Sequence, residues 1–379
     1  MITIYNGKIE NEKYWNLKNN AEYINHDKIY KQNQINDLQD ILKNIVQENA
    51  MSDVKGGFFL SGGLDSSLLT AIVLKEKFKS NYKIPISIKF IPNGVEDEKY
   101  VKILENYFNT KIEWVQITND IARNTLEELI KYLDEPLENP THVGTYLMAK
   151  KARELGLKTV ITGDGSDEFF IGYKRQVAWI NDKNAKENYP SLNQIISKQN
   201  MEKLYKKDIL NKLKNKSYIP ENVKNMQEAL FYERGERLPE YHNMRLDRMT
   251  MAYGIEAKVP FEDVRLAEFS LNISIEDLMR KERKGLLKEV SKKWLLDDVI
   301  YRKKSIFPSL PDEWISEESG INWAKNILLN ENALIKQYFN QNVIKEFIED
   351  HEKNKIKYGR ELWALIVLEL WFQNLKNWK

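Results

Sequence analysis

Residues 56–67 read GGFFLSGGLDSS, a short apolar segment that runs through a glycine-rich turn into a helix. The segment 56–60 is typical of a strand buried in a parallel sheet. After the turn, Leu68, Leu69 and Ile72 fall on one face of a helix. Two glycines permit a tight turn at the helix N-terminus, where consecutive backbone N–H groups suit an anion. The stretch therefore predicts a phosphate-binding loop between a strand and a helix.

The seven residues SGGLDSS, from Ser61 to Ser67, look like the pyrophosphate-binding loop of ATP pyrophosphatases, which cleave ATP between the α and β phosphates. The hydroxyls of Ser61 and Ser66 add donors for phosphate oxygens, and Asp65 adds a carboxylate that can hold a divalent cation. An ordinary glycine-rich turn is the alternative, and the full heptapeptide disfavours it. No G-x-x-x-x-G-K-[ST] occurs in the chain, so a kinase-type P-loop is excluded. The loop predicts adenylation, in which a substrate oxygen attacks the α-phosphate and pyrophosphate leaves.

Composition narrows the classes of protein that fit. The 379 residues include 58 Lys and Arg against 56 Asp and Glu, a net charge of +2, which argues against a polyanion-binding surface. The lysine-rich stretch 203–216 is interpreted as a solvated helix face, because it lacks interleaved aromatic residues. The absence of cysteine excludes disulfides, thiolate zinc sites and a cysteine nucleophile.

The same sequence lacks targeting and membrane signals. Residues 1–15 have no apolar signal-peptide core, and the longest apolar run, 362–368, is far shorter than the about 20 residues of a membrane span. We therefore expect a soluble, cytoplasmic protein without a membrane or nucleic-acid partner.

Strand and helix patterns alternate along the first half of the chain. Strands are predicted at 56–60, 84–90, 112–117 and 159–162, and helices around 38–45 and at 65–78, 97–108, 121–133 and 146–155. Alternation with short connections predicts an α/β fold with a doubly wound parallel sheet. We expect a lead-in at 1–34 and one domain at 35–379, with a nucleotide-binding core at about 35–180 and a helical part at about 181–379.

A second loop, GDGSDE at 163–168, follows the last predicted strand as the first loop follows its own. Ligands of such sheets bind at the carboxyl ends of the strands, where Ser61 and Gly163 both lie. Asp65 and Asp167 could then share a Mg²⁺ ion that neutralises the leaving pyrophosphate. The alternative is an acidic turn, because Gly-Asp-Gly-Ser is good turn sequence.

With both loops in view, the chain resembles the synthetase domain of the asparagine synthetase family from about residue 12 to the C-terminus. Further stretches carry the resemblance: LDEP at 133–136, GDGSDE at 163–168 with Gly172 and Tyr173, DRMTMA at 247–252 with Glu256 and VPF at 259–261, Lys284 with Leu286 and Leu287, and RKK at 302–304 with Phe307 and Trp314.

The resemblance implies a fold of the ATP-pyrophosphatase type (adenine nucleotide α-hydrolase-like), with ATP and Mg²⁺ as cofactors. It also implies roles for particular residues. Leu60, Ile88, Thr162 and Gly163 would hold adenosine; Ser61, Gly62, Gly63 and Ser66 would hold pyrophosphate; Asp65 and Asp167 would hold Mg²⁺; Lys304 would lie against the reacting phosphate, and Asp164 would be an acid near the reacting centre.

Classical family members begin with a glutaminase domain whose nucleophile is an N-terminal cysteine. This chain starts close to where that domain would end and contains no cysteine. We therefore expect the nitrogen to come from free ammonia, from an amine-bearing substrate, or from a separate glutaminase partner.

Several positions depart from the family pattern in the half that would bind the acceptor. Ile171 and Ile306 replace glycines, Lys258 replaces an arginine, Glu262 occupies an apolar position, and Asn139 a position that is often acidic. These changes put aspartate in doubt as the substrate, whereas the ATP half retains the pattern.

The sequence thus predicts an ATP-dependent carbon–nitrogen ligase. It would adenylate a carboxylate, release AMP and pyrophosphate, and transfer the acyl group to ammonia or an amine. The product would be asparagine or that of a specialised biosynthetic amidation. Two alternatives remain: a tRNA-modifying pyrophosphatase, which a basic surface or sulfur-carrying cysteines would favour, and a non-catalytic nucleotide-binding relative, which loss of Asp65 or Asp167 would favour.

Overall fold

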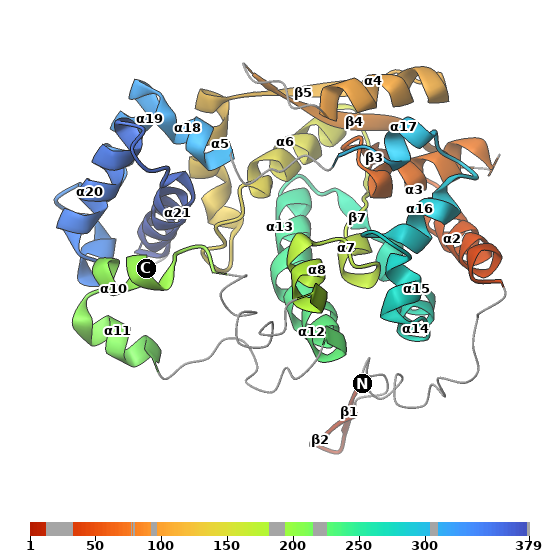
Figure 1. The fold of residues 1–379 in the computed structure, drawn as a ribbon, viewed down its shortest axis with the longest axis horizontal. Coiled ribbons are helices and arrows are strands. Elements are labelled where there is room, and N and C mark those ends of the chain that lie inside the picture. The colour runs from red at the N-terminus through yellow and green to blue at the C-terminus, as the bar shows by residue number, and fades with distance from the viewer. Residues whose placement is uncertain are drawn as a thin grey trace.

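A parallel sheet forms the centre of the α/β part of the chain. The computed structural model describes residues 1–12, 33–76, 78, 80–91, 97–181, 194–214, 226–303 and 310–376. The strands of this sheet are β3 (Gly56–Phe59), β4 (Tyr82–Ile91), β5 (Glu113–Thr118), β6 (Thr159–Ile161) and β7 (Glu256–Lys258). Their spatial order is β5-β4-β3-β6-β7, and every pairing is parallel (Figure 1). The predicted α/β fold with a parallel sheet is confirmed.

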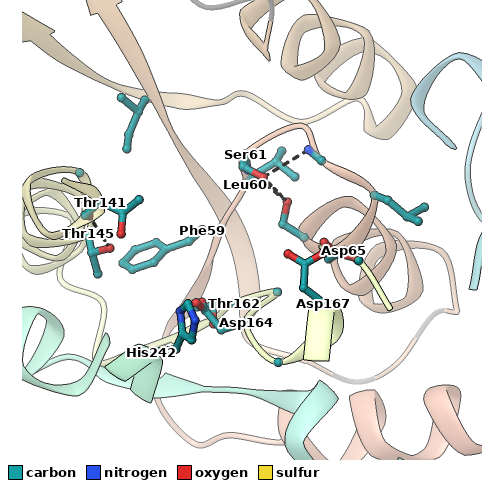
Figure 2. A pocket seen from close by; sticks show the side chains of 18 of the residues that line it. Phe59, Leu60, Ser61, Asp65, Thr141, Thr145, Thr162, Asp164, Asp167 and His242 are labelled. Carbon is teal, nitrogen blue, oxygen red and sulfur yellow. Dashed lines mark hydrogen bonds between the residues drawn. The ribbon is translucent and has the colours of Figure 1, made fainter. Parts of the chain in front are cut away.

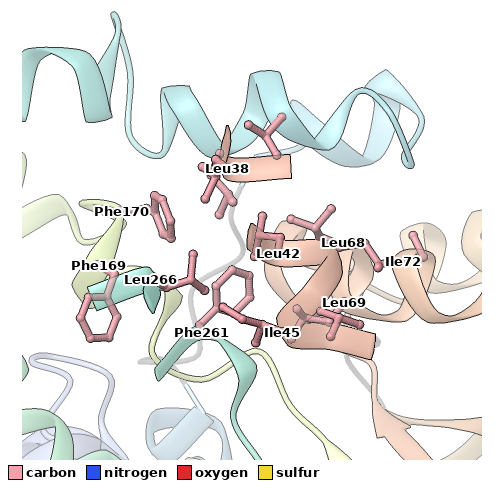
Figure 3. Packing of buried hydrophobic residues seen from close by; sticks show 14 of the residues in the cluster. Leu38, Leu42, Ile45, Leu68, Leu69, Ile72, Phe169, Phe170, Phe261 and Leu266 are labelled. Carbon is pink, nitrogen blue, oxygen red and sulfur yellow. The ribbon is translucent and has the colours of Figure 1, made fainter. Parts of the chain in front are cut away.

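All four residues of the central strand β3 are buried. Since successive side chains of a strand point to opposite sides, both faces of β3 are covered. Phe58 packs into the cluster formed with α2 (Gln34–Ala50) and α3 (Leu64–Lys75), whereas Phe59 packs against Ala149 of α6 (Thr141–Glu154). Figure 3 shows Leu42 and Ile45 of α2 beside Leu68 and Leu69 of α3. Helices on both faces of the sheet thus anchor the strand that leads into the glycine-rich loop.

The predicted strands are confirmed, with ends that differ by at most two residues from those expected. The helix α4 (Asp97–Phe108) has the predicted bounds, and the helix predicted at 121–133 is α5 (Asn119–Leu129) followed by the 3-10 turn η1 (Ile130–Tyr132). The start predicted at Tyr146 for α6 is wrong. The helix begins at Thr141, whose backbone N–H donates to Asn139 Oδ1 at 3.0 Å, and its first turns face a cavity.

Helices dominate the rest of the chain. They are α7 (Ser166–Phe169), α8 (Lys174–Asn181), α10 (Lys198–Leu204), α11 (Lys207–Lys214), α12 (Met226–Tyr232), the π-helix η2 (Glu233–Asn243), α13 (Met244–Met251), η3 (Pro260–Glu262), α14 (Val264–Leu271), α15 (Ile275–Met279), α16 (Gly285–Ser291), α17 (Asp297–Ile300), α18 (Leu310–Ser316), α19 (Glu318–Leu328), η5 (Leu334–Gln337), α20 (Gln341–Glu352) and α21 (Gly359–Lys376). A cluster around Trp314 and Trp363 joins α18 to α21, with ring centroids 5.0 Å apart.

Two elements lie outside the expected pattern. The strand β7, sequence Glu-Ala-Lys, has no apolar run and exists because it pairs with β6. Within the predicted lead-in, β1 (Ile2–Tyr5) and β2 (Lys8–Asn11) form an exposed antiparallel hairpin. None of the described helices is long and apolar enough to cross a bilayer.

Candidate functional site

A cavity of about 660 Å³ opens at the carboxyl ends of β3, β4 and β6. Its size suits a nucleotide-sized ligand. All but one of the residues predicted to bind ATP or Mg²⁺ line it: Leu60, Ser61, Gly63, Asp65, Ser66, Ile88, Thr162, Gly163 and Asp167. Asp164 lines it as well, and Gly62 does not. Lys304 lies outside the described residues.

The first loop is held by hydrogen bonds between its two ends. Ser61 Oγ and Ser66 Oγ lie 3.1 Å apart, and Ser66 Oγ also accepts from the backbone N–H of Ser61 at 3.1 Å. Gly62 has a φ of 70°, a left-handed conformation that glycine adopts without a steric cost. The loop leads directly into the N-terminus of α3, whose N-cap, Gly63, provides no side-chain cap. The positive end of the helix therefore faces the cavity, as anion binding requires.

The second loop touches the first. A Cβ atom on Gly163 would lie 2.8 Å from the backbone nitrogen of Ser66, so only glycine fits there without a shift. Ser166, at the start of α7, donates its hydroxyl to Asp65 Oδ1 at 2.7 Å. These contacts bring the two predicted carboxylates together, and Figure 2 shows Asp65 beside Asp167 at one end of the cavity.

A lysine ammonium lies between these carboxylates. Lys284 Nζ is 2.7 Å from Asp65 Oδ1 and 2.7 Å from Asp167 Oδ1. The side chain is 8% exposed. Burial alone would lower the pKa of Lys284, but the charges of Asp167 and Asp65 raise it above its ordinary value. In the sequence, Lys284 stands out only as part of a stretch that resembles the family. Its contacts with Asp65 and Asp167 could not be predicted, because both residues are more than a hundred positions away.

The two carboxylates fit a magnesium ion. Mg²⁺ prefers hard oxygen ligands, and it is commonly held by one or two carboxylates together with phosphate oxygens and water. Among the described residues, no group of three or more His, Cys, Asp or Glu side chains could hold a metal ion. The donor set therefore suits an ion that arrives with a polyphosphate better than a metal held by protein ligands alone.

Gly172 leaves room for this arrangement. A Cβ atom at this position would lie 2.6 Å from Asp167 Cγ and would overlap both Asp167 Oδ1 and Lys284 Cε. Its neighbour Ile171 is fully buried and has a φ of 55°. A left-handed conformation costs a β-branched residue about 1–2 kcal/mol. The glycine expected at 171 would avoid that strain, which buried packing offsets here.

Beyond the carboxylates, the cavity wall carries a second set of polar groups. Arg245 Nη2 donates to Asp164 Oδ1 at 2.5 Å, and Arg245 Nη1 donates to Thr145 Oγ1 at 2.8 Å. Tyr173 OH donates to Glu168 Oε1 at 2.6 Å. Sequence reasoning missed Arg245. Its partner, Asp164, lies 81 residues earlier, and no local pattern of the helix distinguishes this arginine from others.

Burial shifts the pKa values of Glu168 and His242 in this wall. Burial, followed by the charge of Asp167, raises the pKa of Glu168 to about 7. Burial, followed by the charge of Arg245, lowers the pKa of His242 to about 3, so the imidazole is neutral at physiological pH. His242 Nε2 is buried and has no hydrogen-bond partner among the described residues. Groups with pKa values shifted in this way cluster at functional sites.

Of the positions that depart from the family pattern, some line the cavity and others do not. Asn139 lines the cavity and caps the start of α6. Glu262 packs beneath Gly165, and its Oε2 accepts from Asn243 Nδ2 at 2.5 Å. Lys258 does not line the cavity, and its Nζ donates to Asn49 O at 2.7 Å. A role for Lys258 in clamping a substrate carboxylate is therefore not supported. Ile306 lies outside the described residues.

Comparison with known proteins agrees with this architecture. The family model for asparagine synthase matches residues 37–373. Asparagine synthetase [glutamine-hydrolyzing] 1 of Bacillus subtilis (strain 168) is 24% identical over 387 residues, which cover 89% of this chain and 59% of the relative. Asparagine synthetase [glutamine-hydrolyzing] 3 of the same organism is 26% identical over 407 residues, covering 95% and 62%.

A third relative is asparagine synthetase B [glutamine-hydrolyzing] of Escherichia coli (strain K12). It is 26% identical over 286 residues, which cover 72% of this chain and 44% of the relative. The chain thus matches less than two thirds of the length of each of these relatives.

Proposed function

The chain belongs to the asparagine synthase family, and on that premise we propose that it is an ATP-dependent carbon–nitrogen ligase that adenylates a carboxylate. The family uses ATP with Mg²⁺. The observation that carries the proposal is the convergence of two strand-end loops, which brings Asp65 and Asp167 to one point of the cavity.

ATP would bind across the carboxyl ends of β3, β4 and β6. Leu60, Ile88 and Thr162 would contact adenosine, and the N-terminus of α3 would face the β and γ phosphates. Mg²⁺ bound by Asp65 and Asp167 would neutralise the charge that develops on the departing pyrophosphate. We further propose that Lys304 stabilises charge on the reacting phosphate, as the family resemblance implies.

The acceptor chemistry would occur beside the second loop. Asp164 is held by Arg245, so its carboxylate has a fixed orientation towards the cavity. The carboxylate of the acid would be held there so that one of its oxygens attacks the α-phosphate in line with the departing pyrophosphate, and the amine would be held beside the acyl carbon. Water would be excluded from the reactive acyl-adenylate. The amine nitrogen then attacks the acyl carbon, AMP leaves, and the proton passes to a nearby base. We propose that the core at about 35–180 supplies the phosphate loops, and the helical part at about 181–379 supplies Arg245 and Lys284.

The first test is the identity of the products. With a suitable acid, turnover is expected to release AMP and pyrophosphate in equal amounts, because the loop Ser61–Ser67 is of the pyrophosphate-binding type. An ATP–pyrophosphate exchange screen over carboxylic acids, beginning with aspartate, identifies the acid and separates asparagine formation from a specialised amidation. ADP and orthophosphate as primary products would contradict adenylation.

The second test concerns nitrogen. These 379 residues contain no cysteine, so the purified chain is not expected to take nitrogen from glutamine by thiolate chemistry. Ammonium or an amine-bearing substrate should support amide formation, with a rate that rises towards alkaline pH as free amine replaces its protonated form. The measurement supplies glutamine labelled in its amide nitrogen and follows the label. Labelled product in the absence of a glutaminase would overturn this assignment.

A further inference from the structure

The ammonium of Lys284 and a divalent cation cannot both be held between Asp65 and Asp167. Lys284 Nζ lies 2.7 Å from one oxygen of each carboxylate. A cation shared by the same two oxygens would lie at almost the same point. Even if it used the other carboxylate oxygens, it would be within a few ångströms of a positive charge, and at that distance repulsion in a protein interior is strong.

The lysine is built into this position. Lys284 is the N-cap residue of α16, and its φ of 57° makes the backbone turn sharply at the cavity wall. The backbone of Gly172 passes so close that any side chain there would overlap Lys284 Cε. Arg283 Nη1 donates to Gly172 O at 3.1 Å and holds that backbone in place. Lys284 also lines the cavity, so its ammonium can reach a ligand without refolding of the helix.

We propose that Lys284 is an internal competitor of the metal ion: it neutralises Asp65 and Asp167 until a nucleotide phosphate draws its ammonium away, so that Mg²⁺ binds with ATP and not before it. This inference rests on the proposed function for the identity of the nucleotide. It assigns Lys284 two opposite effects. The ammonium weakens binding of a metal ion alone, and it strengthens binding of the metal–nucleotide complex by pairing with a phosphate.

Opposite effects allow a sharp test. Lys284→Met is expected to bind Mn²⁺ in the absence of nucleotide about tenfold more tightly, or better, than the wild type, because the competing charge is gone. The same variant is expected to bind Mn²⁺ together with a non-hydrolysable ATP analogue more weakly. Isothermal titration calorimetry and the Mn²⁺ electron paramagnetic resonance signal measure both affinities without any turnover. Lys284→Gln, which keeps a polar group at the site, is expected to change both affinities in the same directions.

Lys288→Met is the matched control. Lys288 lies one turn further along α16, lines the same cavity and pairs with Glu282, so its replacement removes one positive charge at a greater distance from the carboxylates. Its Mn²⁺ affinity is expected to equal that of the wild type. A further readout is thermal unfolding: Lys284→Met should melt at a lower temperature than the wild type in EDTA and should regain stability when Mg²⁺ is added.

The proposal is overturned if Lys284→Met and Lys284→Gln, folded by circular dichroism, bind free Mn²⁺ no more tightly than the wild type. It is also overturned if Lys288→Met shows the same gain. Failure of the proposed function has a different signature. If no acid supports pyrophosphate exchange but the Mn²⁺ affinities change as expected, the ligase assignment is wrong and the competition stands.

Discussion

Asp167→Asn is expected to reduce ATP–pyrophosphate exchange by about 10³-fold, because a metal ion on the phosphates contributes several kcal/mol to the transition state and the amide is a poor ligand for it. Asp65→Asn is expected to have an effect of similar size. Both residues line the cavity, and one oxygen of each lies 2.7 Å from Lys284 Nζ. Each substitution therefore removes one of two carboxylates that converge on the same point. The measurement is pyrophosphate exchange with the activated acid at saturating Mg²⁺.

Asp208→Asn is the matched control for these variants. Asp208 is an exposed acid on α11 and does not line the cavity, so exchange should equal that of the wild type. Circular dichroism and thermal unfolding establish that the variants fold. Near-normal exchange in folded Asp65→Asn or Asp167→Asn would show that these carboxylates do not share a metal ion during catalysis.

Gly172→Ala is expected to abolish most of the ATP–pyrophosphate exchange, because the added Cβ clashes with its neighbours. The added Cβ would overlap Asp167 Oδ1 and Lys284 Cε, so one carboxylate and the ammonium must move away from their positions. Overpacking of this kind in a buried site costs about 1–3 kcal/mol of stability. We expect a lower midpoint in urea unfolding together with weakened binding of the metal–nucleotide complex, measured by calorimetry.

Gly235→Ala separates this local clash from a general effect of losing a glycine. A Cβ at Gly235, in the π-helix η2, has no atom within 4 Å, and its φ is not in the left-handed region. Its exchange activity should match that of the wild type, and its stability should equal or slightly exceed it, because alanine is more favourable than glycine inside a helix. If Gly172→Ala also retained full exchange, Asp167 and Lys284 would be free to rearrange, and the close packing at this site would have no functional consequence.

The strand β3 was predictable because its residues are apolar on both faces, as Phe58 and Phe59 illustrate. The strand β7 was not predictable, because Glu256–Lys258 has no pattern of its own and takes its conformation from pairing with β6. The early start of α6 was missed for a related reason. Its first residues are polar or small because they face the cavity, and this interrupts the apolar period on which helix prediction depends.

The sequence by itself identified the glycine-rich loop, its serines and the aspartates at 65 and 167 as candidate site residues, because the residue types of a predicted phosphate-binding turn lie next to one another in the chain. The tertiary structure alone decided that Lys284, 219 positions from Asp65, lies between the two carboxylates, and that Arg245, 81 positions from Asp164, orients that acid. No local pattern encodes such pairs. They form because packing of the helical part against the sheet buries charges that must then be neutralised by one another.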